Sequence, residues 1–416
     1  MRFSVFYEHQ IPRPHADGDE ARVVAEALEQ VQLADRLGFS TVWEVEHHFL
    51  EEYSHSAAPE VFLAACAATT TNINIGHGIV PVPPGFNHPA RVAERISTLD
   101  IVSGGRVQFG TGETSSDMEL KGFRVEREHK RAMWEESVPQ IARMMYQEPY
   151  PGYEGKWFSM PARNVVPKPV QKPHPPIWVA CSQRETILMA GRRGIGGLSF
   201  GFIDPSEAAQ WAQGYYDEFD ACVDPIALAP NPNLAVTSGF MCHRDEQTAI
   251  DRGLDGFHFF AYSLSHYYLH GTHRPGSTDV WSEFEANRDE MGFEKLVAAV
   301  DAARAAVGGT AGGGLDSLRG CIGTPEQIRE FVRAYEDAGV DELIFVSQAG
   351  NNRHDDICES LELFAAEVMP EFAERAADVE AAKRERHAEA IERLSDISHV
   401  DKHPVVDEVV TAFPAS

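Results

Sequence analysis

Several features that would direct the interpretation elsewhere are missing from this 416-residue chain. Its six cysteines form no C-x-x-C pair, which predicts scattered thiols of a reducing compartment rather than a disulfide framework. No run of 18 apolar residues occurs, and the opening MRFSVFYEHQ lacks the apolar core of a signal peptide. We therefore expect a cytoplasmic protein without membrane spans.

Positive charge is also scarce. The chain has 36 Lys and Arg against 64 Asp and Glu, a formal net charge of −28. Binding to phosphate backbones needs clustered cations, so this balance argues against nucleic acid or an anionic membrane as a partner. It leaves a small organic substrate open.

Two enzyme motifs are absent as well. A doubly wound sheet normally has G-x-G-x-x-G after its first strand, but the strand expected at 2–7 continues into EHQIPRPH without a glycine. Metal-dependent hydrolases on barrels usually show H-x-H at strand one, where only His9 stands, and H-E-x-x-H does not occur. We predict no metal ligands.

What the chain does contain is an alternation of short apolar runs and amphipathic segments. Eight strands are expected at 2–7, 40–46, 73–81, 106–112, 177–182, 196–201, 233–243 and 341–348. The first helices are expected at 20–37, 59–70, 89–105 and 127–147. This order predicts an α/β fold, a parallel (β/α)8 TIM barrel with insertions.

Changes in composition along the chain predict its domain limits and its irregular segments. We predict a barrel over residues 1–370 and a charged C-terminal helix and tail over 371–416, with the helix at 371–394. Three further segments are expected to be a Pro-rich excursion at 150–177, an irregular region at 262–292, and a hinge or turn at 309–314.

Active sites of such barrels lie at the C-terminal ends of the strands. Strand two ends in Glu46-His47-His48, where one imidazole would face the barrel mouth and the other pack behind it. A structural role and a functional role fit this doublet equally well. Gly78, Gly110 and Gly112 fit either simple turns or the close approach of a flat ring.

The stretch CSQRET, residues 181–186, opens a predicted helix. Its free N–H groups, with Ser182 and Arg184, suit a phosphate, although an ordinary helix cap explains the same residues. Cys181 is expected to be buried rather than reactive.

Four stretches resemble the bacterial luciferase family of flavin-dependent monooxygenases in sequence and spacing, over residues 1 to about 369. They are GFSTVWEVEHHFLEE, AAPEVFLAACAATTTNINIGHGIV, HPARVAERISTLDIVSGGRVQFGTG and GTPEQIREFVRAYEDAGVDELIF. The resemblance implies that reduced FMN binds at the strand ends. With molecular oxygen as co-substrate, a flavin hydroperoxide would then oxidise a small organic substrate. It also implies a separate flavin reductase, and we expect a homo-oligomer, with a dimer favoured.

Individual residues follow from the same resemblance. His47 matches the family's catalytic histidine, and Gly78-Ile79 falls where the family often has a non-proline cis peptide bond under the flavin. Where the luciferase catalytic subunit has an arginine near the phosphate, this chain has Glu113, so Arg184 is expected to compensate the phosphate charge. The expected cofactor-binding residues are Gly78, Ile79, Gly112, Cys181, Ser182, Gln183, Arg184 and Glu185.

The region 262–292 matches a mobile active-site loop of the family, and its aromatic residues Tyr262, Tyr267, Tyr268 and Phe284 are expected to close over the flavin. Residues expected to contact the substrate or form this lid are Tyr7, Glu46, Tyr53, Tyr262 and His266. Two alternatives stay open: a deazaflavin-dependent hydride-transfer oxidoreductase on the same barrel, and a non-catalytic flavin-binding partner subunit. Neither the substrate nor light emission follows from the fold.

Overall fold

The computed structural model describes residues 1–291, 319–410 and 412. Eight parallel strands close into a barrel, because each pairs with the next and the last pairs with the first. The strands are β1 (Arg2–Tyr7), β2 (Thr41–Glu44), β3 (Asn74–Pro81), β4 (Val107–Gly112), β7 (Ile177–Cys181), β8 (Gly196–Ser199), β9 (Leu234–Cys242) and β11 (Glu342–Val346). Each lies within its predicted range, which confirms the (β/α)8 barrel.

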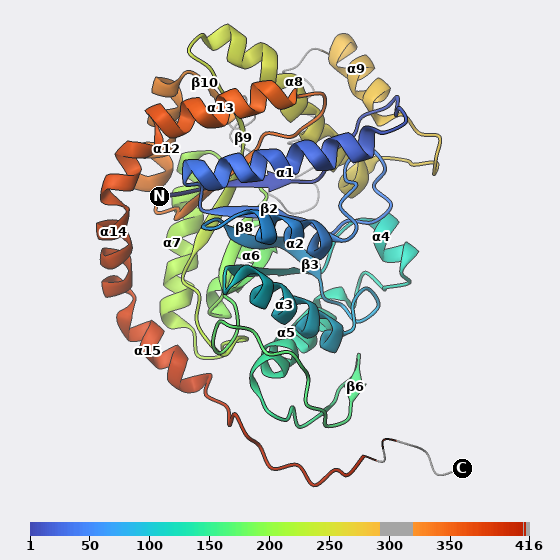
Figure 1. The fold of residues 1–416 in the computed structure, drawn as a ribbon, viewed down its shortest axis with the longest axis vertical. Helices are drawn as coiled ribbons and strands as arrows, with labels where there is room; N and C mark the ends of the chain where they lie inside the picture. Colours follow the sequence, from blue (N-terminus) through green and yellow to red (C-terminus); the bar gives the residue numbers. More distant parts are fainter. Residues whose placement is uncertain (292–318, 411, 413–416) are drawn as a thin grey trace.

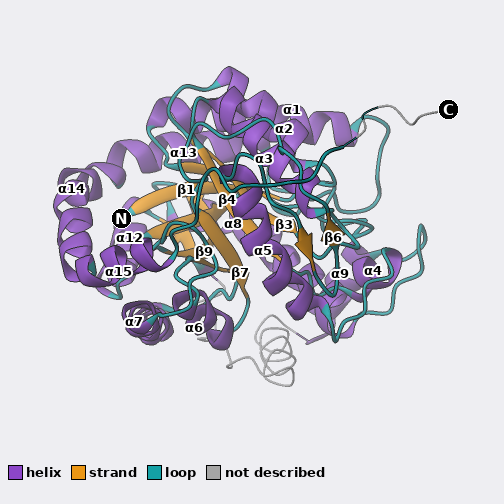
Figure 2. Cartoon of the chain, turned by 90° about the horizontal axis from the view of Figure 1, so that it is seen from below, coloured by secondary structure: helices purple, strands orange, loops and turns teal. Residues whose placement is uncertain are grey.

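Helices surround these strands (Figure 2). Those of the N-terminal half are α1 (Asp19–Leu37), α2 (Pro59–Thr69), α3 (Pro89–Ser103), α4 (Asp117–Gly122), α5 (Lys130–Tyr146) and α6 (Arg184–Arg192). Those of the C-terminal half are α7 (Pro205–Ala221), α8 (Glu246–Ser265), α9 (Val280–Met291), α12 (Pro325–Asp337), α13 (His354–Glu367), α14 (Met369–Arg386) and α15 (Ala388–Ile397). α1 and α3 end at Gly38 and Gly104, whose positive φ angles suit glycine.

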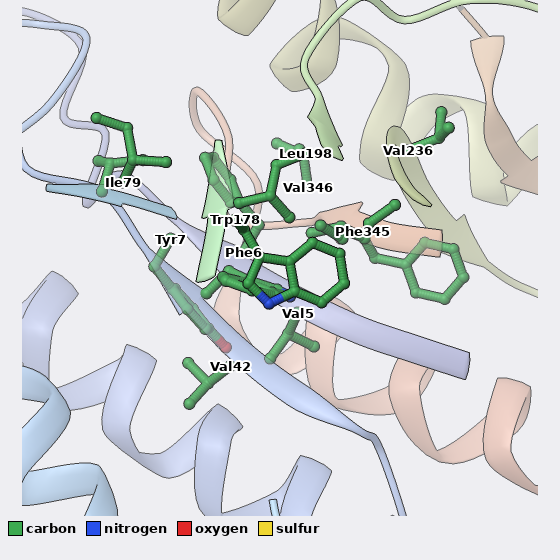
Figure 3. Packing of buried hydrophobic residues seen from close by; sticks show 14 of the residues in the cluster. Val5, Phe6, Tyr7, Val42, Ile79, Trp178, Leu198, Val236, Phe345 and Val346 are labelled. Atoms are coloured by element: carbon green, nitrogen blue, oxygen red, sulfur yellow. The ribbon is translucent and has the colours of Figure 1, made fainter. Parts of the chain in front are cut away.

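Two indole rings pack edge to face in the barrel core. Trp43 of β2 and Trp178 of β7 lie 5.5 Å apart, and Nε1 of Trp43 donates a hydrogen bond of 2.8 Å to the buried Glu342 carboxylate. A Cβ at Gly76 or Gly196 would collide with these rings. Figure 3 shows Trp178 beside Phe6, Leu198 and Val346 in this core.

Two segments differ from expectation, and a third cannot be compared. The region 262–292 is largely helical: α8 extends to Ser265, the π-helix η1 (His266–His270) continues it, and α9 begins at Val280. The charged helix predicted at 371–394 is divided between α14 and α15, which meet at His387. The stretch predicted as a hinge at 309–314 lies outside the described residues.

Shorter elements lie outside the barrel. β10 (Cys321–Gly323) adds a parallel strand beside β9, and β5 (Tyr153–Glu154) pairs with β6 (Ser159–Met160) inside the Pro-rich excursion. The C-terminal tail extends from α15 along the outside of the molecule (Figure 1), and its Glu408 carboxylate accepts a 2.9 Å hydrogen bond from the amide of Ala162 in this excursion. None of the described helices is long and apolar enough to cross a bilayer.

Candidate active site

The His47-His48 doublet sits in the loop that follows β2, at the C-terminal end of the barrel. Two backbone hydrogen bonds fix this loop: the amide of Glu46 donates to the carbonyl of Ile79 at 3.0 Å, and the amide of His47 donates to the carbonyl of Ser56 at 2.9 Å. The loop is therefore fastened both to β3 and to the chain that leads into α2.

Two carboxylates and a phenol surround the imidazole of His47. Its Nδ1 lies 3.0 Å from Oε1 of Glu119 in α4, and its Nε2 lies 3.9 Å from Oε1 of Glu8, directly after β1. The hydroxyl of Tyr268 in η1 lies 3.2 Å from Nδ1 and 3.4 Å from Nε2. The side chain of His47 is 15% exposed, so most of its surroundings are protein.

These neighbours set the charge of the cluster. Burial by itself lowers the pKa of His47, but Glu119 and Glu8 outweigh it and raise that pKa to about 9. Burial alone raises the pKa of Glu119, yet His47 and the hydrogen bonds of Thr114 and His48 hold it below its usual value. Burial raises the pKa of Glu8 to about 7 against the opposing effect of His47. At neutral pH the unit is an imidazolium, a carboxylate, and a second carboxyl that is partly protonated.

Aromatic rings pack beside this cluster. Tyr53 has its ring 5.7 Å from His47 and 5.3 Å from Phe260 of α8, and Phe6 of β1 lies 5.4 Å from Phe200. The phenol of Tyr53 also hydrogen bonds to Glu8. The expected residues His47 and Tyr53 are thus brought together, with apolar rings around them that exclude water.

Glu46 and His48 belong to a second network behind the first. Oε1 of Glu46 lies 3.3 Å from Nε2 of His48 and accepts a 2.8 Å hydrogen bond from Asn87. Arg95 of α3 bonds the same Asn87 and pairs with Glu60 of α2 at 2.8 Å. His48 therefore packs toward the helices, while His47 faces the cluster.

Close packing between β3 and β4 requires glycine at positions 110 and 112. β3 bulges between His77 and Val80. A Cβ at Gly110 would collide with the carbonyl of His77, and one at Gly112 with the side chain of Ile79. The four cis peptide bonds of the described chain all precede proline, so Gly78-Ile79 is trans, contrary to expectation.

The start of α6 is more open. Cys181 is buried, and burial raises its thiol pKa to about 12, in line with the expected inert thiol. Gln183 caps the helix with Thr186 in a reciprocal capping box. Ser182, Arg184 and Glu185 are exposed, and Glu185 pairs with Arg192.

Two cations near this end were missed by sequence reasoning. Glu113, which directly follows β4, pairs with Arg131 at 2.6 Å and with Lys130 at 3.5 Å, both from the start of α5. Arg131 lies close enough to Cys181 for its charge to lower the thiol pKa slightly against burial. The negative charge at position 113 is therefore offset locally, and Arg131 reaches toward the end of β7.

Three of the residues expected to contact the substrate or form the lid do not lie beside His47. Tyr7 points out of the barrel against Phe62 of α2. The hydroxyl of Tyr262 accepts a hydrogen bond from Asn287 of α9, and Nδ1 of His266 lies 3.3 Å from Glu283. Tyr262 and His266 thus attach η1 and α8 to α9. In the part of the chain that the structure describes, no group of three or more His, Cys, Asp or Glu side chains is arranged to hold a metal ion.

Comparison with known proteins places the chain in a family. The sequence profile of the luciferase-like monooxygenases matches residues 1–342, and the chain belongs to this family of oxidoreductases. It is 30% identical over 198 residues to the oxygenase component of a flavin-dependent trigonelline monooxygenase of Acinetobacter baylyi, covering 47% of this chain and 52% of that protein. It is 25% identical to the 4-hydroxyprotoasukamycin monooxygenase of Streptomyces nodosus subsp. asukaensis, covering 83% and 86%. The matches to the first curated relatives span about half of those relatives' length.

Solved structures share the fold. The oxygenating constituent of 3,6-diketocamphane monooxygenase from Pseudomonas putida, in complex with FMN, superimposes with a TM-score of 0.65 at 18% identity, over 89% of this chain and 98% of that one. The coenzyme F420-dependent tetrahydromethanopterin reductase of Methanopyrus kandleri superimposes with a TM-score of 0.61 at 18% identity, over 89% and 99%. Both flavin and deazaflavin enzymes therefore use this fold.

Proposed function

We propose that this chain is the oxygenase component of a two-component monooxygenase, which binds reduced FMN at the C-terminal ends of the barrel strands and oxidises a small organic substrate with molecular oxygen. The observation that carries the proposal is the cluster of the partly buried His47 and Tyr268 with the buried Glu119 and Glu8 at that end of the barrel. Reduced flavin, when bound, supplies the electrons that activate oxygen.

The chain's own residues fit that cofactor at both ends. Oε2 of Glu8 is buried without a hydrogen-bond partner, so an unsatisfied polar atom remains inside the cluster. At the other end, the exposed Ser182, the first N–H groups of α6 and Arg131 form a donor set for a phosphate. His47 would hold a proton at the reacting end, while Tyr53 and Phe260 exclude water.

The segment from η1 to α9 is suited to act as the lid. Tyr268 contributes its hydroxyl to the His47 cluster, and the carbonyl of Tyr267 accepts a hydrogen bond from Ser116 beside α4. The buried carboxylate of Glu52 accepts from the amides of Val280 and Trp281 at 2.6 and 3.1 Å. In this proposal the described arrangement would be the closed one, because Glu52 fastens the segment to the loop that follows His47.

A direct test is anaerobic titration of the purified protein with reduced FMN and with reduced F420, followed by exposure to oxygen with a panel of small organic substrates and an added flavin reductase. We expect tight binding of reduced FMN and oxygen uptake that depends on a substrate. Oxidation of reduced F420 by a substrate without oxygen uptake would instead establish the deazaflavin alternative, which the F420-dependent structural neighbour supports. Binding of flavin without any turnover would favour the non-catalytic partner subunit.

The remaining partner assignments are part of the same proposal. A separate reductase is supported by the relative whose name describes an oxygenase component. Homo-oligomerisation, with a dimer favoured, and the cytoplasmic location stay predictions, which sedimentation of the purified protein and fractionation of cells would test.

A further inference from the structure

Resting on the proposed function, we infer that Glu8 is a second proton site of the catalytic centre, which exchanges a proton with Nε2 of His47 while Glu119 fixes Nδ1. The structure brings these three side chains together from β1, the β2 loop and α4. Neither Glu8 nor Glu119 stands out in the sequence as a partner of His47.

The role of Glu119 follows from its donors. Its carboxylate accepts from the hydroxyl of Thr114, from the amide of His48 at 3.0 Å, and from Nδ1 of His47 at 3.0 Å. A carboxyl that accepts three hydrogen bonds is held in its ionised form. Nδ1 of His47 therefore keeps its hydrogen, and Glu119 is a positioning residue that fixes the orientation of the ring.

The other ring nitrogen of His47, Nε2, has no carboxylate within hydrogen-bond distance. It lies 3.9 Å from Oε1 of Glu8, beyond hydrogen-bond distance, and 3.4 Å from the hydroxyl of Tyr268. Because no strong acceptor occupies it, Nε2 is the position at which His47 can lose and regain a proton. Other ionisable groups that act on the ring are Glu46 and, across its face, Tyr53.

Glu8 is suited to hold that proton. It is 2% exposed, and the groups that act on it are His47, Tyr53, Ser54 and Glu119. His47 is the one cation among them, and Glu119 already pairs with it more closely. Oε2 of Glu8 has no hydrogen-bond partner. Burial raises the pKa of this carboxyl to about 7, so both protonation states are accessible near neutrality.

The step is a simple proton exchange. After Nε2 of His47 has given its proton to a reacting atom, rotation of the Glu8 carboxyl must close the 3.9 Å gap to hydrogen-bond distance. The O–H bond of the Glu8 carboxyl then breaks and an N–H bond forms at Nε2. The products are a Glu8 carboxylate and a His47 imidazolium, and no electrons change hands. Since the two groups interact, they titrate as a pair, with one apparent pKa near that of Glu8 and one near that of His47.

The test uses the cofactor-free full-length protein with ¹³C-labelled histidine rings, in which the His47 resonance is assigned by its loss in His47→Gln. The wild-type His47 shift is expected to show two inflections, near pH 7 and near pH 9. In Glu8→Gln the lower inflection should vanish and the upper one move down by about one pH unit. Glu20→Gln, which removes an exposed carboxylate 3.0 Å from His55, is the control and should leave both His47 inflections unchanged.

A single inflection in the wild type, or a lower inflection that persists in Glu8→Gln, would overturn the assignment. Should Glu8→Gln fail to fold, Tyr53→Phe offers a second variant: its hydroxyl lowers the pKa of Glu8, so its loss should move the lower inflection upward, and an unmoved inflection would also count against Glu8. With reduced FMN, oxygen and substrate, Glu8→Gln should lower product formed per oxygen about tenfold at pH 6.5, where the Glu8 carboxyl of the wild type is mostly protonated. If no substrate is ever oxidised, the proposed function fails while the titration still decides the role of Glu8.

Discussion

The two ends of the candidate site are built differently. Around His47, the carboxylates of Glu8 and Glu119 and the hydroxyl of Tyr268 lie within 4 Å of the imidazole, and the phenol of Tyr53 bonds to Glu8. At the start of α6, Ser182 and Arg184 are exposed. The nearby cation Arg131 is partly exposed and is paired with Glu113. If the proposed function holds, the end that handles protons is preorganised by the fold, whereas the phosphate end would be completed by the ligand itself.

The largest effect is expected from breaking the preorganised end. His47→Ala removes the proton-carrying group, so product formed per oxygen should fall by roughly 10²–10⁴-fold while reduced FMN binding changes only a few-fold. Product and hydrogen peroxide measured against oxygen uptake would check this. His48→Ala is the matched control, because His48 faces Glu46 and Phe123 and should cost much less. Wild-type coupling in His47→Ala would remove His47 from the mechanism.

Substitutions at the phosphate end, around the start of α6, should change only the affinity for the cofactor. Arg131→Ala is expected to weaken FMN more than riboflavin, by on the order of 1–3 kcal/mol, because only FMN carries the phosphate. The sequence pointed to Arg184 for this role, and Arg184→Ala is the matched comparison. Fluorescence titrations of both flavins decide between the two arginines. Equal weakening of FMN and riboflavin by Arg131→Ala would show that Arg131 does not contact the phosphate.

The contrast between the ends also reflects what a sequence reveals. The eight strands were predictable because each is a short apolar run, and His47 because it follows one of them. The role of Glu119 was not predictable, because a six-residue helix between β4 and α5 brings it to His47, which is 72 positions away in the sequence. The His- and Tyr-rich stretch at 262–270 looked irregular, but packing of Phe259 and Tyr262 against Phe284 accompanies its helical form.

The charged groups around His47 should also make the free energy of unfolding depend on pH. The folded protein raises the pKa of Glu8 from 4.5 to about 7 and that of His47 from 6.5 to about 9, so it binds more protons than the unfolded chain between these values. Stability should therefore fall as pH rises from about 5 to 9, with the His47 part, on the order of 2 kcal/mol, lost between 6.5 and 9. Denaturant unfolding at several pH values measures this. In Glu119→Gln the loss above pH 6.5 should shrink, and an unchanged slope would contradict the role of Glu119.

The smallest effect is expected from loosening the proposed lid, whose Tyr268 contacts His47. Glu52 is fully buried and caps the first amides of α9, and Glu51 beside it accepts from the amide of Gly276 at 2.7 Å. Glu52→Gln replaces one acceptor oxygen with an amide donor, so one helical N–H loses its partner at a cost of about 1–2 kcal/mol. The barrel should stay folded, because this cap lies outside its strands.

The consequence for function follows from where the lid is attached. A loosened α9 gives η1 and its Tyr268 more freedom beside His47, so water enters more often and product formed per oxygen should drop a few-fold. Amide exchange at Val280 and Trp281 should accelerate in parallel. Glu51→Gln is the matched control, since Glu51 is partly exposed and its loss should have a weaker effect. Faster exchange with unchanged coupling would mean that α9 is a surface element and not part of the enclosure around His47.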